Sequence, residues 1–203
     1  MVETTRRREI EAAASTLFHE RGYSGTSVRD IARALDIQGA SLYAHVTSKE
    51  EVLWSIVERT ATRFEAAADA ATDGIDATDA PARLDALVRA HVGVVAEDVE
   101  RASVFVYEWR SLASSKRSAI SRRRDAYEGR FRTVIEQGVA TSGFDAVDPL
   151  AAAAFILTAL NGLVAWYRPS GRLRPADVAS AYAGLALGAV GAAVTAGKDG
   201  ISR

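Results

Sequence analysis

Hydrophobic residues recur along most of this chain at the three- and four-residue spacing of a helix face, without strand-like alternation between turn signals. The first such stripe runs from Ile10 to Phe18, and Gly22 follows as a residue that commonly ends helices. We therefore predict a first helix at about residues 4–21 and an all-α fold for the whole chain.

Two short helices are predicted next. The apolar stripe returns over residues 28–35, where Ser27 and Asp30 form the S-x-x-D capping pattern, and again over residues 38–45. Two short helices joined by a tight turn have the length of a helix-turn-helix, whose second helix enters the major groove of DNA. By spacing alone the pattern is also compatible with other all-α proteins.

The rest of the chain is predicted to be helical with short breaks. Ser48 and Glu51 form a second capping-box pattern at the start of a long fourth helix. Residues 70–80 are polar and rich in helix breakers, so we expect a loop that ends at Pro81. The later helices are expected at residues 81–97, 100–114, 117–141, 148–168 and 175–196.

Two segments need a separate interpretation because they lack charge. Residues 150–167 and 178–197 contain no charged side chain over about the length that spans a bilayer. Alanine and glycine dominate both segments and add little to membrane insertion. We interpret them as buried helices that form the contact between two subunits, with a purely intrachain core and a membrane hairpin as the alternatives.

Composition narrows the class of protein. A chain of 203 residues buries a core without cross-links. The absence of cysteine excludes disulfides, thiol catalysis, zinc–thiolate sites and iron–sulfur clusters, and it is compatible with a reducing cytoplasm. The N-terminal segment lacks the apolar core of a signal peptide, so we expect a cytoplasmic protein. Residues 1–49 hold seven Lys/Arg and six Asp/Glu, so DNA binding would depend on local positive charge.

The residues of the short-helix region resemble a known family. The stretch TSVRDIARALDIQGASLYAHVTSKEEVL at residues 26–53, preceded by ASTLFHERGYSGTS, is similar to the TetR family of one-component repressors. The resemblance implies an N-terminal three-helix DNA-binding domain at residues 1–47 and a helical ligand-binding and dimerisation domain at residues 48–203. It also implies a homodimer that binds palindromic double-stranded operator DNA and is released by a small-molecule inducer.

Four positions depart from the family pattern. Asp36 stands where the family usually has glycine in the turn, and Asp tolerates the left-handed conformation better than most residues. Gly39 replaces a common lysine, Ala40 a common glycine and Val46 a common phenylalanine. These differences leave open how deeply the recognition helix enters the groove.

The motif offers two kinds of DNA contact. Gln38 and Ser41 are expected to read base edges, since Gln bonds bidentately to adenine, and Ala40 is expected to contact a thymine methyl group. Tyr43 and Lys49 are expected to bind phosphates. The predicted DNA-binding residues are Arg6, Arg7, Arg8, Ser27, Gln38, Gly39, Ala40, Ser41, Tyr43, His45 and Lys49.

Some of these residues have a simpler interpretation. Arg6, Arg7 and Arg8 are predicted to form an arm that reaches phosphates or a minor groove, and the alternative is a solvated chain end. Tyr43 is alternatively a half-buried packing residue, and His45 an ordinary surface residue.

The C-terminal part carries candidate ligand contacts. Asn161 lies within an apolar helix, where an unpaired amide is costly, so it needs a buried partner, a dimer mate or a ligand. Seven Lys/Arg between residues 116 and 132 outnumber two Asp/Glu, which fits either a solvated helix face or recognition of ligand phosphates. Core packing alone explains most of the aromatic residues. The predicted ligand contacts are Phe105, Trp109, Arg117, Arg124, Asn161, Trp166 and Arg168.

The inducer is suggested by a second resemblance. AWYRPSGRLRPADVASAYAGLALGAV at residues 165–190 looks like the C-terminal domain of acyl-CoA-responsive TetR-type regulators, which implies an acyl-coenzyme A thioester. Nothing indicates an enzyme, a cofactor or a metal site, because the histidines at 19, 45 and 91 are scattered and no catalytic motif is present. We interpret His91 as a satisfied core residue. The alternative function is a membrane-associated or non-DNA-binding helical interaction protein.

Overall fold

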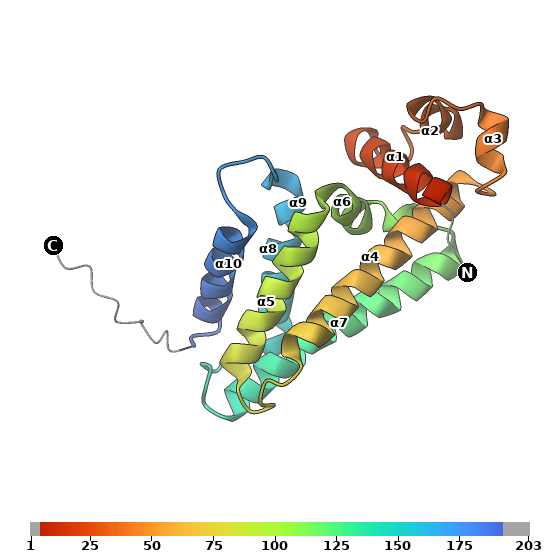
Figure 1. Ribbon diagram of the computed structural model, residues 1–203. Coiled ribbons are helices and arrows are strands. Elements are labelled where there is room, and N and C mark those ends of the chain that lie inside the picture. Colours follow the sequence, from red (N-terminus) through yellow and green to blue (C-terminus); the bar gives the residue numbers. More distant parts are fainter. Residues whose placement is uncertain (1–4, 193–203) are drawn as a thin grey trace.

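The computed structural model describes residues 5–192, and helices are its only regular elements over that range (Figure 1). The all-α prediction is therefore confirmed. A small head is formed by α1 (Thr5–Arg21), α2 (Val28–Ala34) and α3 (Gly39–Tyr43), and it stands at one end of a larger helical body. Phe18 and Leu42, both buried, belong to the hydrophobic core that holds these three helices together.

The long helix α4 (Lys49–Thr72) leads from the head into the body and lies beside α7 (Ser114–Ala140) (Figure 1). The helix α5 (Ala80–Glu97) packs between α4 and α10 (Pro175–Ala189). The head is therefore joined to the body by a continuous helix rather than by a flexible linker. The body consists of α4 (Lys49–Thr72), α5 (Ala80–Glu97), α6 (Val99–Tyr107), a 3-10 turn (Trp109–Ser111), α7 (Ser114–Ala140), α8 (Pro149–Asn161), α9 (Leu163–Trp166) and α10 (Pro175–Ala189).

Several helix boundaries differ from the sequence prediction, and three of them change the course of the chain. The helix expected at 100–114 ends at Tyr107 and continues as a 3-10 turn, the tighter geometry that is frequent at helix ends. The helix expected at 148–168 is divided at Gly162 into α8 and α9. The last helix ends at Ala189 instead of residue 196, because Gly191 adopts a left-handed φ of 65°. Residues 193–203 lie outside the described residues.

The outer surface of α8 and α10 is apolar. Phe155 is 64% exposed and Leu185 is 69% exposed, and the two line a groove of about 460 Å³ between these helices. By length and composition alone, the segment Pro149–Trp166 is long and apolar enough to cross a membrane. Within the structure, 33% of this segment is buried. An unpaired apolar face of this kind also suits a contact with another subunit.

Candidate functional site

The first turn of α2 is fixed by a complete capping box. The Asp30 backbone N–H donates to the Ser27 hydroxyl at 3.2 Å, and the Ser27 backbone N–H donates to the Asp30 carboxylate at 2.9 Å. The Ser27 hydroxyl itself donates to the same carboxylate, which lowers the pKa of Asp30. The predicted cap is thus confirmed. A phosphate contact by Ser27 would use the exposed backbone end of α2 rather than a free hydroxyl.

Asp36 sets the angle between α2 and α3. Its φ is 52°, in the left-handed region, so the aspartate adopts the turn conformation that glycine usually provides. The backbone N–H of Ile37 donates to the Ala32 carbonyl at 3.0 Å and closes the turn. Asp36 thus tolerates the left-handed conformation, as the sequence analysis expected of an aspartate at this position.

The short helix α3 presents one face to solvent and one to the core. Leu42 is fully buried, whereas Tyr43 is 56% exposed, which contradicts the alternative that Tyr43 is a half-buried packing residue. Gln38, at the N-cap, makes no side-chain capping bond, so its amide is not used to hold the helix. The side chains of α3 and its N-cap that are exposed to solvent are Gln38, Ala40, Ser41 and Tyr43.

Lys49 lies at the start of α4, directly after the cap Ser48, as predicted, and its ammonium binds the loop between α1 and α2. Its ammonium donates to the Tyr23 carbonyl at 2.8 Å and to the Thr26 carbonyl at 2.7 Å, and it lies 4.0 Å from the centre of the Tyr23 ring. Partial burial lowers the pKa of Lys49, while nearby Glu108 opposes that shift. Two of the three N–H donors of Lys49 are therefore used inside the chain, because the loop between α1 and α2 turns its carbonyls toward the start of α4.

The three N-terminal arginines do not form an extended arm. Arg6, Arg7 and Arg8 lie in the first turn of α1, which begins at Thr5. Arg6 pairs with a carboxylate of its own helix, Glu9, at 2.7 Å, because the two residues lie three positions apart. The arm prediction is wrong for these residues.

Glu51 joins α1 to the start of α4. Its carboxylate accepts from the guanidinium of Arg7 at 2.9 Å and from the backbone N–H of Thr47 at 2.5 Å. The hydroxyl of Ser48 caps α4 by accepting from the Glu51 backbone N–H at 3.0 Å, as predicted, but Glu51 returns its carboxylate to Thr47 instead of Ser48. The predicted capping box is therefore only half formed. The hydrogen bonds from Thr47 and the charge of Arg7 lower the pKa of Glu51.

A buried carboxylate that the sequence analysis did not single out also joins these two helices. Glu11 is 2% exposed, accepts a hydrogen bond from the Ser55 hydroxyl and lies 3.4 Å from the guanidinium of Arg59. Its position on the apolar face of the first helix, one turn before Ala14, was a usable signal, since a carboxylate there needs a partner. The head is thus fixed to α4 by polar contacts as well as by packing.

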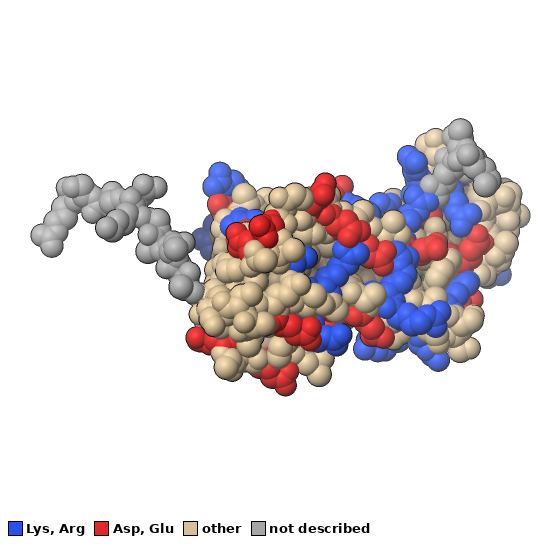
Figure 2. All heavy atoms as spheres, turned by 90° about the horizontal axis from the view of Figure 1, so that it is seen from below, with Lys and Arg blue, Asp and Glu red and all other residues tan. Residues whose placement is uncertain are grey.

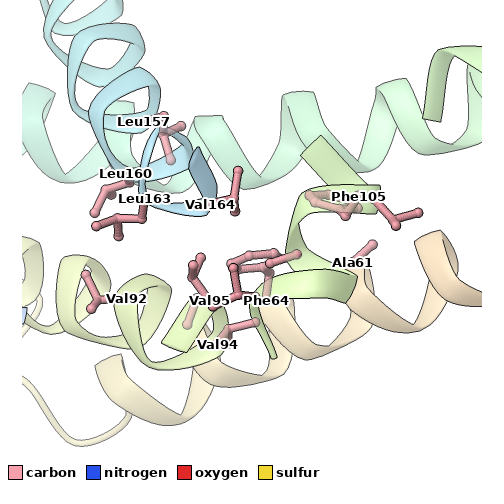
Figure 3. Packing of buried hydrophobic residues seen from close by; sticks show 14 of the residues in the cluster. Ala61, Phe64, Val92, Val94, Val95, Phe105, Leu157, Leu160, Leu163 and Val164 are labelled. Carbon is pink, nitrogen blue, oxygen red and sulfur yellow. The ribbon is translucent and has the colours of Figure 1, made fainter. Parts of the chain in front are cut away.

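A cavity of about 390 Å³ lies in the body. Figure 3 shows the surrounding core, in which Phe64, Phe105 and Leu157 come from α4, α6 and α8. The lining residues Ala61, Phe64 and His91 are buried, so the cavity is closed at its end beside them. The cavity opens to solvent at the exposed lining residues, which are Arg110, Asp125, Ala154 and Thr158. The lining residues are Ala61, Phe64, Glu65, His91, Phe105, Trp109, Arg110, Ser121, Arg124, Asp125, Tyr127, Glu128, Ala154, Leu157, Thr158 and Asn161.

Four of the predicted ligand contacts meet in this cavity: Phe105, Trp109, Arg124 and Asn161. Arg117 lines a neighbouring hollow of about 440 Å³, which shares Trp109, Arg110 and Ser121 with the cavity.

Two predicted ligand contacts lie elsewhere. Trp166 stacks on Tyr182 of α10 with ring centres 6.3 Å apart, and Arg168 donates to the carbonyl of its neighbour Tyr167 at 2.9 Å. Both residues sit where α9 ends and the chain leaves toward α10, so neither side chain lines the cavity or the hollow.

Arg124 combines a positive charge with aromatic surroundings. Its guanidinium lies 5.0 Å from the ring centre of Phe105 and 5.2 Å from that of Trp109, and it donates to the Phe105 carbonyl at 3.4 Å. Burial, and then the neighbouring charge of Arg110, lower the pKa of Arg124. The cavity lining also contains Glu65, Asp125 and Glu128, so its two guanidinium groups are balanced by carboxylates. The neighbouring hollow holds Arg110 and Arg117 without a carboxylate and is the part that suits a negatively charged group.

Three of the seven basic residues at positions 116–132 pair with carboxylates of α4. Arg123 pairs with Glu65 at 2.6 Å, Lys116 with Glu50 at 3.6 Å, and Arg130 with Asp69. Figure 2 shows basic and acidic side chains intermixed over the face seen from below. Part of the cluster is thus an ion-paired contact between two helices, and Arg132 pairs with Glu136 of its own helix. Arg124 and Arg117 are the members at the cavity and its hollow.

The sequence analysis missed His91 and Tyr127 as lining residues. His91 is buried, as expected, and its Nδ1 lies 3.3 Å from the Tyr127 hydroxyl, but its Nε2 has no hydrogen-bond partner in the described part of the chain. The interpretation of His91 as a satisfied residue is therefore wrong. Burial, with a smaller effect of Arg124, lowers the pKa of His91 to about 3, so the imidazole is neutral. Residues 5–192 contain no group of three His, Asp or Glu that could hold a metal ion.

Both parts of the chain match described families. Residues 10–56 match "Bacterial regulatory proteins, tetR family", and residues 77–190 match "Tetracyclin repressor-like, C-terminal domain".

The chain is also similar to named regulators. It is 31% identical over 190 residues to the HTH-type transcriptional repressor KstR2 of Rhodococcus jostii (strain RHA1), which spans 90% of this chain and 89% of the relative. The structure of the ketosteroid transcriptional regulator KstR2 of Mycobacterium tuberculosis superposes with a TM-score of 0.85 and 28% identity, covering 93% of this chain and 96% of that one. AibR in complex with isovaleryl coenzyme A and operator DNA has a TM-score of 0.78 at 27% identity, covering 89% and 97%.

Proposed function

Because this chain belongs to the TetR family of transcriptional regulators, we propose that it is a dimeric repressor that binds a palindromic operator through α3 and leaves it when an effector enters the cavity. The chain is a regulator rather than an enzyme. The observation that carries the proposal is the two-sided recognition helix, with Leu42 buried below and Tyr43 exposed above. We place the protein in the cytoplasm.

In the proposed complex, the exposed side of α3 enters the major groove. Gln38 and Ser41 bond to base edges, and Tyr43 donates its hydroxyl to a backbone phosphate. A Cβ built on Gly39 meets nothing within 4 Å, so the fold does not require glycine there and the space remains for DNA. His45, partly exposed two positions after the end of α3, is proposed to donate to a phosphate, and Arg6 and Arg8 to add positive charge beside the groove.

Lys49 is proposed to act on DNA binding mainly through the fold of the head. Its ammonium ties the loop at Tyr23 and Thr26 to the start of α4. That loop leads directly into Ser27 and the exposed N-terminal end of α2, where backbone N–H groups attract phosphate. Lys49 thus holds an anion-binding helix end in place.

The proposed dimer uses the outer face of α8 and α10. Phe155 and Leu185 are more than half exposed, and Gly184 and Gly188 leave open space beside them that a second copy would fill. A twofold contact brings the same face of each subunit together, and it places two heads on one DNA duplex. The wholly uncharged face favours a second copy of the chain over a water-exposed surface.

The proposed effector is an acyl-coenzyme A thioester. Its acyl part would occupy the cavity, whose 390 Å³ is at the small end of the roughly 300–1,000 Å³ usual for ligand sites. Its phosphates would lie outside, in the hollow that Arg110 and Arg117 line, since guanidinium groups match phosphate geometry. The regulator AibR, similar over most of this chain, was solved with isovaleryl coenzyme A and operator DNA.

Release of DNA follows from linkage between the two sites. The helix α4 carries Lys49 at the head and Phe64 at the closed end of the cavity, so a shift of α4 acts on both. An effector that prefers the conformation in which the heads are misplaced weakens DNA binding by that same preference, a coupling of about 1–3 kcal/mol in typical cases.

The experiment is a fluorescence anisotropy titration of the protein onto a labelled duplex from its own upstream region. Isovaleryl-CoA, decanoyl-CoA and free coenzyme A are then added to the complex. We expect at least one acyl-CoA to release the DNA, with free coenzyme A ineffective at the same concentration. Release by none of them, with calorimetry also showing no binding, would contradict the effector proposal while leaving the DNA-binding proposal in place.

A further inference from the structure

The closed end of the cavity holds an imidazole with an unused nitrogen. His91 is 2% exposed and packs against Phe64 with ring centres 4.6 Å apart and the planes tilted by 36°, and its Nδ1 lies 3.3 Å from the Tyr127 hydroxyl. Its Nε2 is buried and has no partner among the described residues. Buried polar groups without a partner are uncommon and costly, so this nitrogen needs an explanation.

The contact with Tyr127 determines which nitrogen of His91 carries the proton. If the Tyr127 hydroxyl donates to Nδ1, both of those groups are satisfied and Nε2 carries the hydrogen. If Nδ1 carried the hydrogen instead, the phenol proton and the Nε2 lone pair would both lack partners. The arrangement that satisfies more groups therefore presents an N–H donor at Nε2 of a neutral ring.

A second N–H donor among the residues that line the cavity is also without a partner. The indole Nε1 of Trp109 is buried without a partner among residues 5–192, and an indole nitrogen can only donate. Around His91 the lining is aromatic, because the ring centres of Phe64 and Tyr127 lie 4.6 Å and 5.9 Å from that of the imidazole. The wall thus offers hydrogen to an acceptor on a ligand that is apolar elsewhere.

We propose that His91 and Trp109 select effectors that carry an uncharged oxygen acceptor, such as a ketone or ester carbonyl, on the part that enters the cavity. The carbonyl at the closed end accepts from Nε2–H of His91, and Tyr127 positions the imidazole by holding its Nδ1. This inference rests on the proposed effector cavity and adds the chemical class of the buried part. A saturated hydrocarbon group of the same size leaves both donors unpaired, so it binds less tightly.

The experiment uses two probes of nearly the same shape, 2-acetylnaphthalene and 2-isopropylnaphthalene, which differ in a carbonyl oxygen against a methyl group. Their affinities for the full-length protein and for His91→Phe are measured by calorimetry. Phe keeps an aromatic ring beside Phe64 and removes the donor. We expect the ketone to bind His91→Phe about three- to tenfold more weakly than wild type, and the hydrocarbon to bind both alike.

Two further measurements separate recognition from a structural effect. Nitrogen NMR of the imidazoles is expected to show His91 as the Nε2–H tautomer, with an Nε2 shift on addition of the ketone only. The chain has three histidines, so His91→Phe assigns the signal. Tyr127→Phe keeps the ring packing but frees Nδ1, and it should weaken ketone binding without changing hydrocarbon binding.

The outcomes distinguish this inference from the proposed function. If His91→Phe loses affinity for both probes equally, or if the wild type holds the Nδ1–H tautomer, the inference is overturned. Either result is still compatible with the proposed effector cavity. Binding of neither probe to the wild type contradicts the cavity as a site for apolar effectors and overturns both. The DNA-binding proposal is tested by a separate titration, and neither result contradicts it.

Discussion

The Lys49 ammonium donates to the Thr26 carbonyl at 2.7 Å and thereby ties the first turn of α4 to the residue before the cap of α2. Because Thr26 in turn donates its hydroxyl to the carbonyl of Gly22 at 3.0 Å, the loop between α1 and α2 is fixed at both ends. The contact thus lets α4, which reaches the cavity, position α2, whose N-terminal end is proposed to bind DNA. This contact places Lys49 between the two proposed sites.

Substitution of Lys49 separates a positioning role from a phosphate contact. We expect Lys49→Met to lower DNA affinity at every salt concentration because the loop loses its anchor. The slope of log affinity against log salt should stay unchanged, whereas loss of a phosphate contact would reduce it by about 0.9. Anisotropy titrations between low and moderate salt measure both quantities. A shallower salt slope together with an unchanged melting temperature would show that Lys49 binds a phosphate instead.

Tyr43 is the most direct test of the exposed face of α3. Its ring is 56% exposed, so we expect Tyr43→Phe to change the free energy of unfolding by less than about 0.5 kcal/mol. Loss of the phenol hydroxyl should weaken binding to operator and to unrelated duplexes by a similar factor, since phosphate contacts carry no sequence information. Tyr107→Phe, which alters an equally exposed tyrosine in the body, is the matched control. Full DNA affinity in Tyr43→Phe would contradict the contact.

Glu51 predicts a pH dependence of stability. Its pKa is lowered in the folded protein by the Thr47 hydrogen bonds and Arg7, so its stabilising effect is present above the unfolded pKa of about 4.3 and is lost as pH falls through the lower folded value. We expect wild type to be more stable than Glu51→Gln at pH 7, with the difference shrinking between about pH 5 and 3. Urea unfolding at several pH values measures it. A difference that stays constant with pH would show that the charge is not involved.

Leu185 tests the proposed subunit contact. It is 69% exposed on α10, so Leu185→Glu should leave the fold intact but place a charge in the contact and shift the protein toward monomers. Sedimentation velocity reads the oligomeric state, and DNA affinity should fall with it because one head alone binds weakly. Leu173→Glu, at an exposed leucine that lies outside the groove, is the control. Monomeric wild type at micromolar concentration would contradict the dimer.

Local sequence signals predicted the head well. The Ser27 cap and the left-handed Asp36 each depend on residues a few positions apart, so their geometry follows from short-range chemistry. The tertiary contacts of Lys49 were not predictable in this way. Its partners are carbonyls 23 and 26 positions earlier in the chain, and a lysine at a helix start is equally compatible with solvent.

The cavity was only partly predictable for a related reason. Phe105, Trp109 and Asn161 were identified as aromatic or polar residues in apolar helices, but which of them meet depends on how α4 to α8 cross. His91 was misjudged because one histidine on an apolar helix does not reveal whether both of its nitrogens find partners. The helix breaks at Glu108 and Gly162 place Trp109 at the cavity and turn Trp166 away from it. Each break lies between two segments with helical periodicity, so the periodicity alone does not reveal it.

Hydroxyl-radical footprinting of the purified protein on its own upstream DNA, at low ionic strength and without effector, tests the central claim most directly. The account predicts two protected regions related by a twofold axis, with centres about one helical turn or a multiple of it apart. The protection should disappear when Tyr43→Phe and Ser41→Ala are combined. A uniformly cleaved duplex at protein concentrations that saturate the folded dimer would contradict the DNA-binding function.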